Sequence, residues 1–367
     1  MISRFAQTRD ERKKRLDQPA ESDAIHWVEI NRNAAERALH VRDTCRAAVA
    51  KSGDKLVVAT NAILRAAALV SAFFVLTYSF SFAAGEQKSE PAAPADITAS
   101  AVAAPDAAGV VDPHRALLLR AMFARDVTRR LNVPAAAQQE YGQRLQTALE
   151  QNQLGNLSGE YVVLVDRNAN VQALFIYFRA TPSDKWLMIG ASPVATGRPG
   201  EFDHFITPLG VFEHTPDNMD FRAEGTMNEN GIRGYGKRDM RIFDLGWAQG
   251  ERGWGKGGMS QMRFQMHATD PDRLEPLLGV RHSKGCVRIP ASLNVFLDHY
   301  GILDAEYEAL VESGKPLWVL HSDRQVTPWA GRYIVVVDSE RKARPAWSPA
   351  PGSKARAKVP AAGDTAD

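Results

Sequence analysis

The sequence predicts an α+β protein that is mainly β, with helices flanking a β-rich domain. Runs of β-branched and aromatic residues in the middle of the chain predict strands, of which 161–166 (YVVLVD) is the clearest. Helices are predicted before and after these runs, where apolar residues recur at intervals of three and four. One uncharged stretch, residues 66–84, precedes all of these elements.

The overall composition is that of a globular protein with additional segments. The 367 residues are 44% hydrophobic and 24% charged, which favours one or two domains. The 45 Lys and Arg residues against 43 Asp and Glu residues leave a net charge of +2, so no general attraction to nucleic acid is expected. The two cysteines, Cys45 and Cys286, lie on opposite sides of the uncharged stretch, and a disulfide framework is therefore not expected.

The uncharged stretch is long enough to cross a bilayer as a helix, at about 1.5 Å per residue. Basic residues are more frequent just before it than just after it, so the positive-inside rule places the N-terminus in the cytoplasm and exports the rest of the chain. Ser81 and Ala83 also occupy the small-residue positions of a signal-peptidase site. Residues 63–85 are therefore expected to be either an uncleaved transmembrane signal-anchor or a cleaved signal peptide.

Both alternatives place the folded part of the chain in the periplasm or cell envelope, secreted or anchored in the inner membrane through residues 66–84. The polar segment before the stretch is then a cytoplasmic tail or the product of a mis-assigned start codon. The expected organisation is a polar tail at 1–62, the apolar segment at 63–85, an Ala/Pro-rich linker at 86–111, a helical lead-in at 112–157, a β-rich domain at 158–340 and a disordered tail at 341–367.

Two helices are predicted in the lead-in. Asp112 can cap the first helix with Pro113 at its first position. Pro134 can open the second, in which Tyr141, Leu145 and Leu149 share one face.

The β-rich domain is predicted to alternate strands with two later helices. Expected strands are 161–166, 171–178, 186–192, 316–322 (PLWVLHS) and 332–338 (RYIVVVD). A helix is expected soon after Cys286, with Leu293, Phe296, Leu297 and Tyr300 on one face, and another from Asp304 to about Ser313, closed by Gly314.

The segment 266–289 contains the two residue types that catalysis by a thiol needs. Cys286 can act as a nucleophile and His267 can take its proton. A free thiol has a pKa of about 8.5 and is mostly protonated at pH 7, so a nearby imidazole raises the fraction that is reactive thiolate. Gly285 allows a close backbone approach and frees local amides to point at a developing oxyanion. The alternative, a small buried hydrophobic cysteine, suits the polar and turn-forming neighbours less well.

At these residues the sequence resembles the catalytic domain of the L,D-transpeptidase (YkuD) family. That family has a His followed about fifteen to twenty residues later by Ser/Thr-His-Gly-Cys, an apolar or β-branched residue, and Arg or Asn. This chain has His267 and then 283–288 (SKGCVR), with Lys284 where the family usually has His. Segments 193–200 (PVATGRPG) and 207–212 (TPLGVF) also resemble the family's approach to its active site. The resemblance covers roughly residues 159–322, under half of the chain.

The resemblance implies a β-sandwich-like domain that performs cysteine acyl transfer on peptide stems of peptidoglycan, without a cofactor. Cys286 would attack a carbonyl at diaminopimelate and release D-alanine, and an amine of another stem would resolve the thioester. His267 would take the thiol proton, held by a backbone carbonyl close to Ala268. This activity belongs to cell-wall biogenesis and cell shape.

The resemblance also implies the surroundings of the thiol. Amides around Gly285 and Cys286 would form the oxyanion hole. Arg288 would bind a carboxylate, because a guanidinium fork matches carboxylate geometry, with a structural salt bridge as the alternative. The remaining oxyanion and substrate-binding candidates are Ser283, Lys284 and His214, which could line the pocket.

Four alternatives remain at this point. Water could resolve the same thioester, giving an L,D-carboxypeptidase or endopeptidase. The replacement at Lys284 is the argument for a non-catalytic peptidoglycan-binding module. His267, Asp270, Asp272 and His282 could hold a metal ion, although their spacing fits no metal motif and metal is not expected. The glycine-rich segment 246–258 could be a flap over the substrate or a plain surface loop, and it lacks the Ser or Thr of a phosphate-binding loop. The oligomeric state is left open.

Overall fold

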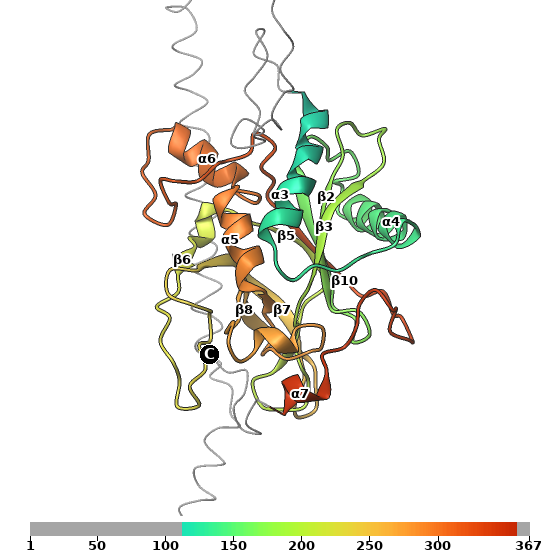
Figure 1. Cartoon of the computed structure of the whole chain (residues 1–367), viewed down its shortest axis with the longest axis vertical. Helices are drawn as coiled ribbons and strands as arrows, with labels where there is room; N and C mark the ends of the chain where they lie inside the picture. Colours follow the sequence, from blue (N-terminus) through green and yellow to red (C-terminus); the bar gives the residue numbers. More distant parts are fainter. Residues whose placement is uncertain (1–111, 358–367) are drawn as a thin grey trace, which may run out of the picture. The chain divides into compact units, whose positions relative to one another are not determined.

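Two mixed β-sheets form the framework of residues 112–357, the part of the chain that the computed structural model describes (Figure 1). These residues have α+β structure with few helices, as the sequence predicts. Among them, no helix has the length and apolar character needed to cross a membrane. The polar tail, the uncharged stretch at 66–84 and the Ala/Pro-rich linker lie outside the described residues.

The first sheet has five strands in the order β3-β2-β1-β10-β5. Its central pair, β1 and β10, is parallel, and the other pairs are antiparallel. Every residue of β1 and β2 is buried, because both faces of the sheet are covered, and this explains their unbroken apolar sequences. The strands are β1 (Tyr161–Asp166), β2 (Ala173–Phe178), β3 (Leu187–Pro193), β5 (Gly210–Glu213) and β10 (Tyr333–Val337).

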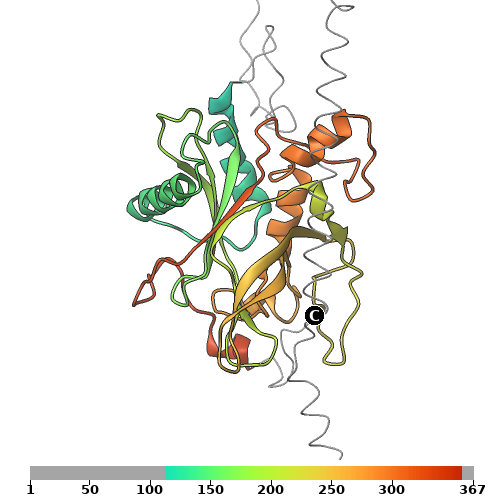
Figure 2. The same ribbon diagram turned by 180° about the vertical axis from the view of Figure 1, so that it is seen from behind.

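Helix α4 (Ala135–Gln151) covers one face of this sheet (Figure 2). Tyr141, Leu145 and Leu149 are fully buried on that helix, as their four-residue spacing predicts. The Tyr141 ring stacks on Phe175 of β2 with a centroid distance of 4.3 Å. The predicted lead-in is thus an integral layer of the fold.

The second sheet has the order β4-β7-β8-β9, and the short strand β6 pairs with β7. Its last pair, β8 and β9, is parallel. Val163 and Ile176 of the first sheet share one apolar core with Phe264, Met266 and Val287 of the second. The strands are β4 (Phe205–Ile206), β6 (Phe221–Arg222), β7 (Arg241–Arg252), β8 (Met259–Ala268) and β9 (Val287–Ile289).

Further helices complete the core between the sheets. Asp112 accepts a hydrogen bond from the His114 amide at 2.9 Å and caps η2 (Pro113–Leu118), which leads into α3 (Leu119–Asp126). Phe123 of α3 meets Phe296 of α5 (Ala291–His299) edge to face at 5.3 Å. The remaining helical elements are α6 (Ala305–Glu312), η3 (Pro216–Asn218), η4 (Glu275–Leu277) and α7 (Ser353–Arg356).

The predicted strand at 316–322 is wrong, because this segment forms turns. The segment pairs with no strand of either sheet. Val319 is buried in the turns, and its carbonyl accepts a hydrogen bond from Arg222 Nε at 2.9 Å. The other predicted strands and both later helices are confirmed within a few residues of their expected ends.

The C-terminal segment also differs from the predicted disordered tail, because residues 341–357 belong to the described structure. Trp347 packs edge to face on Tyr141 and Phe175 at 5.9 and 6.0 Å. Ser348 is buried and its hydroxyl donates to the Val171 carbonyl at 2.6 Å. Arg341 also pairs with Glu140 of α4 at 2.6 Å, so aromatic, hydroxyl and ionic contacts together hold this Ala/Pro-rich segment on the domain. Residues 358–367 lie outside the described part.

Candidate active site

Polar side chains collect on the outer face of the second sheet. Phe264 and Met266 of β8 point into the core, so the alternating residues Arg263, Gln265 and His267 point to the opposite face. These three residues form one row along the strand.

Cys286 joins this row from the neighbouring strand. The parallel register pairs Met266 with Val287 and His267 with Arg288. Cys286 lies two residues before Arg288, so it is on the same face and level with Gln265. Its side chain is partly exposed, and its thiol donates to the Arg263 carbonyl at 3.7 Å. The register therefore brings the predicted nucleophile and the predicted base to one face of adjacent strands.

His267 is fully buried, and one hydrogen bond defines the form of its neutral ring. Nδ1 lies 2.8 Å from the Ala268 carbonyl oxygen, which can only accept, so Nδ1 carries the hydrogen. In the neutral imidazole, Nε2 is then the nitrogen that can accept a proton. The Tyr235 ring packs on the imidazole at 4.6 Å. The backbone carbonyl expected to orient the base is thus the Ala268 carbonyl.

The turn before Cys286 is held by the Ser283 side chain, which is 1% exposed. Its hydroxyl accepts from the Gly285 amide at 3.1 Å and donates to the Cys286 carbonyl at 2.6 Å. Gly285 has φ +140°, and a Cβ atom there would lie 2.7 Å from Met262 Cε. Ser283 therefore shapes the turn, and the Gly285 amide, an expected oxyanion donor, is bonded within it.

The two upstream segments that resemble the family's approach to its site also reach this turn. The Thr207 hydroxyl donates to the Gly285 carbonyl at 2.6 Å and accepts from the Gly197 amide at 2.8 Å. The Thr196 carbonyl accepts from the amides of His282 and Ser283 at 2.9 and 3.1 Å. Segments 193–200 and 207–212 therefore support the nucleophile turn through specific hydrogen bonds.

The two cationic candidates near Cys286 differ in access. Lys284 is half-buried, with Nζ 4.0 Å from an Asp203 carboxylate oxygen. Arg288 is 1% exposed, and its Nη1 donates to the His282 carbonyl at 2.9 Å. Burial and the positive charges of Arg288 and Arg198 lower the pKa of His282 to about 4, so this ring is neutral at pH 7. Arg288 is consequently an interior residue that stabilises the backbone of the turn.

His214 does not line a pocket, contrary to the expectation. It is fully buried, with Nδ1 2.8 Å from the Leu303 carbonyl and Nε2 2.9 Å from Asp220. Asp220 also accepts from Arg241 Nε at 2.6 Å, and Arg241 pairs with Asp304 at 2.8 Å. Burial opposes protonation of this ring, but the Asp220 carboxylate outweighs it and raises the pKa of His214. The residue belongs to a buried charge network, because both ring nitrogens face acceptors.

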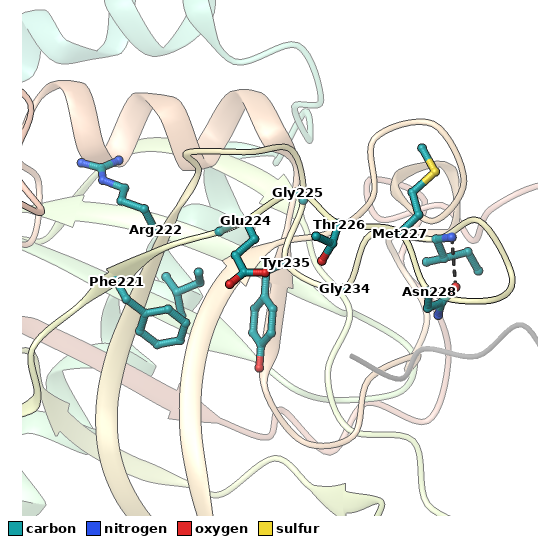
Figure 3. Close-up of a pocket in the computed structure, with 13 residues that line it drawn as sticks. Phe221, Arg222, Glu224, Gly225, Thr226, Met227, Asn228, Gly234 and Tyr235 are labelled. Atoms are coloured by element: carbon teal, nitrogen blue, oxygen red, sulfur yellow. Dashed lines mark hydrogen bonds between the residues drawn. The ribbon is translucent and has the colours of Figure 1, made fainter.

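A pocket of about 420 Å³, drawn in Figure 3, has two neighbours of His267 among its lining residues. Cys286 and His267 do not line it, but Tyr235, which contacts the His267 ring, and Ile242, which pairs with His267 in register, do. Met227 and Ile232 give it an apolar wall, and Glu224 places a carboxylate at its edge. The pocket therefore offers space for a ligand beside the base.

The segment 246–258 contains the last residues of β7, which ends at Arg252, and the turn that leads to β8, which begins at Met259. A phosphate-binding loop would need a helix after the glycines, and none follows here. Trp254 packs on Phe205 with a centroid distance of 4.8 Å, which fixes the hairpin end. In contrast, Trp247 is 67% exposed on the face that carries Cys286. The segment is thus an ordered wall of the site.

The metal alternative is not supported by the positions of its residues. Asp270 is fully buried and accepts from the amides of Asp272, Arg273 and Arg233, so it stabilises a turn. Within residues 112–357, no group of three or more His, Cys, Asp or Glu side chains is arranged to hold a metal ion.

Sequence reasoning missed the polar partners that surround the nucleophile. Asp244 of β7 bonds to Arg263 Nε at 3.0 Å and Gln265 Nε2 at 3.1 Å, and Trp247 lies beside Arg263. The alternation of Arg263, Gln265 and His267 is visible in the sequence. The partners on β7 are visible only after the strands are paired.

Comparison with known proteins gives little further information. No family model and no curated protein matches the chain. One solved structure, a fused Zn-dependent amidase/peptidase/peptidoglycan-binding protein from Clostridium acetobutylicum, is similar at 10% identity with a TM-score of 0.24. The alignment covers 58% of this chain and 66% of that chain, just under two thirds of its length. A TM-score of this size carries no argument about fold or function.

Proposed function

We propose that this protein is an exported peptidoglycan L,D-transpeptidase, with a β-sandwich-like catalytic domain of that family. Its substrate class is the peptide stem of the bacterial cell wall, and its reaction is acyl transfer through a Cys286 thioester. The observation that carries the proposal is the parallel register of β8 and β9, which puts Cys286, level with Gln265, and His267 on one face of neighbouring strands. The resemblance of 283–288 to the family motif supports the choice of substrate.

In the proposed reaction, His267 Nε2 takes the proton of the Cys286 thiol as Sγ attacks the carbonyl carbon at diaminopimelate. The bond to the terminal D-alanine breaks, the alanine nitrogen receives the proton, and a thioester remains. An amine of a second stem then attacks the thioester, and the thiol is regenerated. The hydrogen bond from Nδ1 to the Ala268 carbonyl favours this sequence, because it keeps Nε2 available as the base.

The backbone at the turn has a supporting role in this mechanism. Ser283 and Thr207 hold the amides and carbonyls around Gly285 in one conformation. A rigid arrangement of amide dipoles near the attacked carbonyl stabilises a developing oxyanion, since little reorganisation is needed during the reaction. The proposed location is the periplasm or cell envelope, where the substrate is found.

The test is mass spectrometry of muropeptides after incubation of the purified full chain with tetrapeptide-stem fragments. Wild type is expected to give a cross-linked dimer with loss of D-alanine, and Cys286→Ala is expected to give none. A tripeptide product alone would assign the hydrolytic alternative, an L,D-carboxypeptidase. Chelator should leave product formation unchanged, whereas iodoacetamide should abolish it.

The remaining alternatives give different results in the same assay. An endopeptidase would consume existing cross-links in dimeric muropeptides and leave monomers. A non-catalytic binding module would retain peptidoglycan in both wild type and Cys286→Ser without turnover. Absence of any product from both monomeric and cross-linked stems would reject the enzymatic proposal.

A further inference from the structure

Arg263 has a position that the proposed mechanism does not yet use. Its carbonyl oxygen lies 3.7 Å from Cys286 Sγ, and its side chain projects from the same strand face as His267. The side chain is 34% exposed, in contrast to Arg288, which is 1% exposed. The residue whose carbonyl contacts the nucleophile therefore carries a guanidinium group that reaches solvent.

A buried carboxylate holds one edge of this guanidinium group. Asp244 is 4% exposed and pairs with Arg263 Nε at 2.9 Å. The same carboxylate accepts from the Gly246 amide at 2.8 Å and from Gln265 Nε2 at 3.1 Å, so it is fixed from three directions. The Arg263 Nη atoms have no hydrogen bond to any of residues 112–357. Arg263 is thus anchored through Nε, with its terminal nitrogens available for a ligand.

Trp247 completes the arrangement on the outer side. It pairs with Arg263 in register, and its ring lies 5.7 Å from the guanidinium carbon. A bulge between Asp244 and Trp247 puts both side chains on the same face although they are three residues apart. Gly246 in the bulge has φ +79°, a conformation that favours glycine. The local backbone therefore brings an anchor, a cation and an exposed indole together.

We propose that Arg263 is a specificity-determining residue that binds a carboxylate of the acyl donor beside Cys286, with Trp247 covering the adjoining aliphatic part. A guanidinium group with one edge anchored presents its remaining N–H groups in the planar geometry that a carboxylate accepts. The identification of the donor as a peptidoglycan stem rests on the proposed function. The inference that a carboxylate binds next to the thiol is independent of that function.

The first experiment measures carboxylate recognition without a peptide. The thiol is alkylated with iodoacetate or with its neutral analogue iodoacetamide, so that the S–C bond forms and iodide leaves. The rate ratio of iodoacetate to iodoacetamide is measured for wild type, R263Q and R263K in the full chain. R332Q is the matched control, because Arg332 is also 34% exposed and paired with acidic residues, but lies beside β10.

The ratio is expected to fall about tenfold in R263Q, the loss typical of one charge-assisted hydrogen bond, and to stay unchanged in R332Q. R263K keeps the charge without the fork and is expected to lie between wild type and R263Q. Circular dichroism identifies any variant that fails to fold. An R263Q ratio equal to that of wild type would overturn the proposal, as would an equal fall in R332Q.

The second experiment uses tetrapeptide stems with a free or an amidated carboxylate. R263Q is expected to raise KM about tenfold for the free acid with little change in kcat, and to leave KM for the corresponding amide unchanged. If wild type turns over no stem while the alkylation ratio behaves as expected, the proposed function fails and the carboxylate site stands. If R263Q affects acid and amide equally, Arg263 has no such role and the transpeptidase proposal is untouched.

Discussion

Replacement of Thr207 by valine tests whether one hydroxyl group holds the nucleophile turn. Thr207 is fully buried, donates to the Gly285 carbonyl at 2.6 Å and accepts from the Gly197 amide at 2.8 Å. Valine has nearly the same shape, so it removes both hydrogen bonds without opening a cavity. The amide and the carbonyl are then left buried and unsatisfied.

The expected cost follows from these two groups. Each buried polar group left without a partner costs about 1–3 kcal/mol, so loss of both partners in Thr207→Val should lower the free energy of unfolding by about 2–6 kcal/mol. Thr207→Ser is the matched control, since it keeps the hydroxyl and loses one methyl group, which costs about 1 kcal/mol. Because the Gly285 carbonyl precedes Cys286 directly, product formation on stem peptides should fall further in the valine variant than in the serine variant.

Urea titration of the full chain measures the stability change through the midpoint and the slope of the transition. An unchanged slope is needed for the comparison, because it shows that the same surface is exposed on unfolding. If the free energy of unfolding of the valine variant lay within about 0.5 kcal/mol of the wild-type value, the reasoning would be refuted, because two unsatisfied buried groups should destabilise the fold by more than this. Equal losses in the valine and serine variants would show that the hydroxyl group contributes no more to stability than the methyl group does.

Three other predictions rest on single contacts. The pKa of His214 is raised in the folded protein, so its pairing with Asp220 stabilises the fold fully below about pH 6.5, and this contribution is lost as pH rises through the folded pKa. The free energy of unfolding, measured from pH 6 to 9, should therefore fall in wild type and change less in His214→Gln. Gly285→Ala should melt at a lower temperature, and its Cys286 thiol should be alkylated at a different rate, because residue 285 has φ +140° and its Cβ would lie 2.7 Å from Met262 Cε. A melting temperature equal to that of wild type would contradict this. Trp347→Ala should lower the free energy of unfolding, measured by urea titration, by about 2 kcal/mol, because a partly buried indole is removed from the first sheet. An unchanged free energy would mean that the segment does not stabilise the domain.

The elements with strong local patterns were predictable from the sequence. The four-residue spacing of Tyr141, Leu145 and Leu149 predicts α4, and the apolar runs at 161–166 and 332–338 predict β1 and β10. In these segments the same residues favour the local conformation and are buried in the core, so the local propensity and the burial pattern indicate the same structure. The segment 316–322 has a similar composition but forms turns, in which Val319 is buried and its carbonyl bonds to the Arg222 side chain instead of to a strand.

The long-range arrangement of charges was not predictable. His214 has no pattern that distinguishes a buried ion pair from a pocket lining, and its partner Asp220 pairs in turn with Arg241 of β7. Arg288 stands in the motif position, yet the fold buries it, while Arg263 outside the motif reaches solvent. Burial of a charged side chain depends on which elements cover it, and a linear sequence does not contain that information.

The sequence by itself determined which reactive groups the candidate site contains, because the thiol and the imidazole are part of the covalent structure of Cys286 and His267. The thiol follows a glycine, and the imidazole lies nineteen residues earlier in the chain. The tertiary structure alone decided which groups surround them. The parallel register of β8 and β9 brings the thiol and the base to one face of neighbouring strands, and the bulge in β7 brings Asp244 and Trp247 to the same face. Hydrogen bonds between strands set these positions. Strand pairing brings together residues that are far apart along the chain, and their separation in the sequence does not indicate that they are in contact.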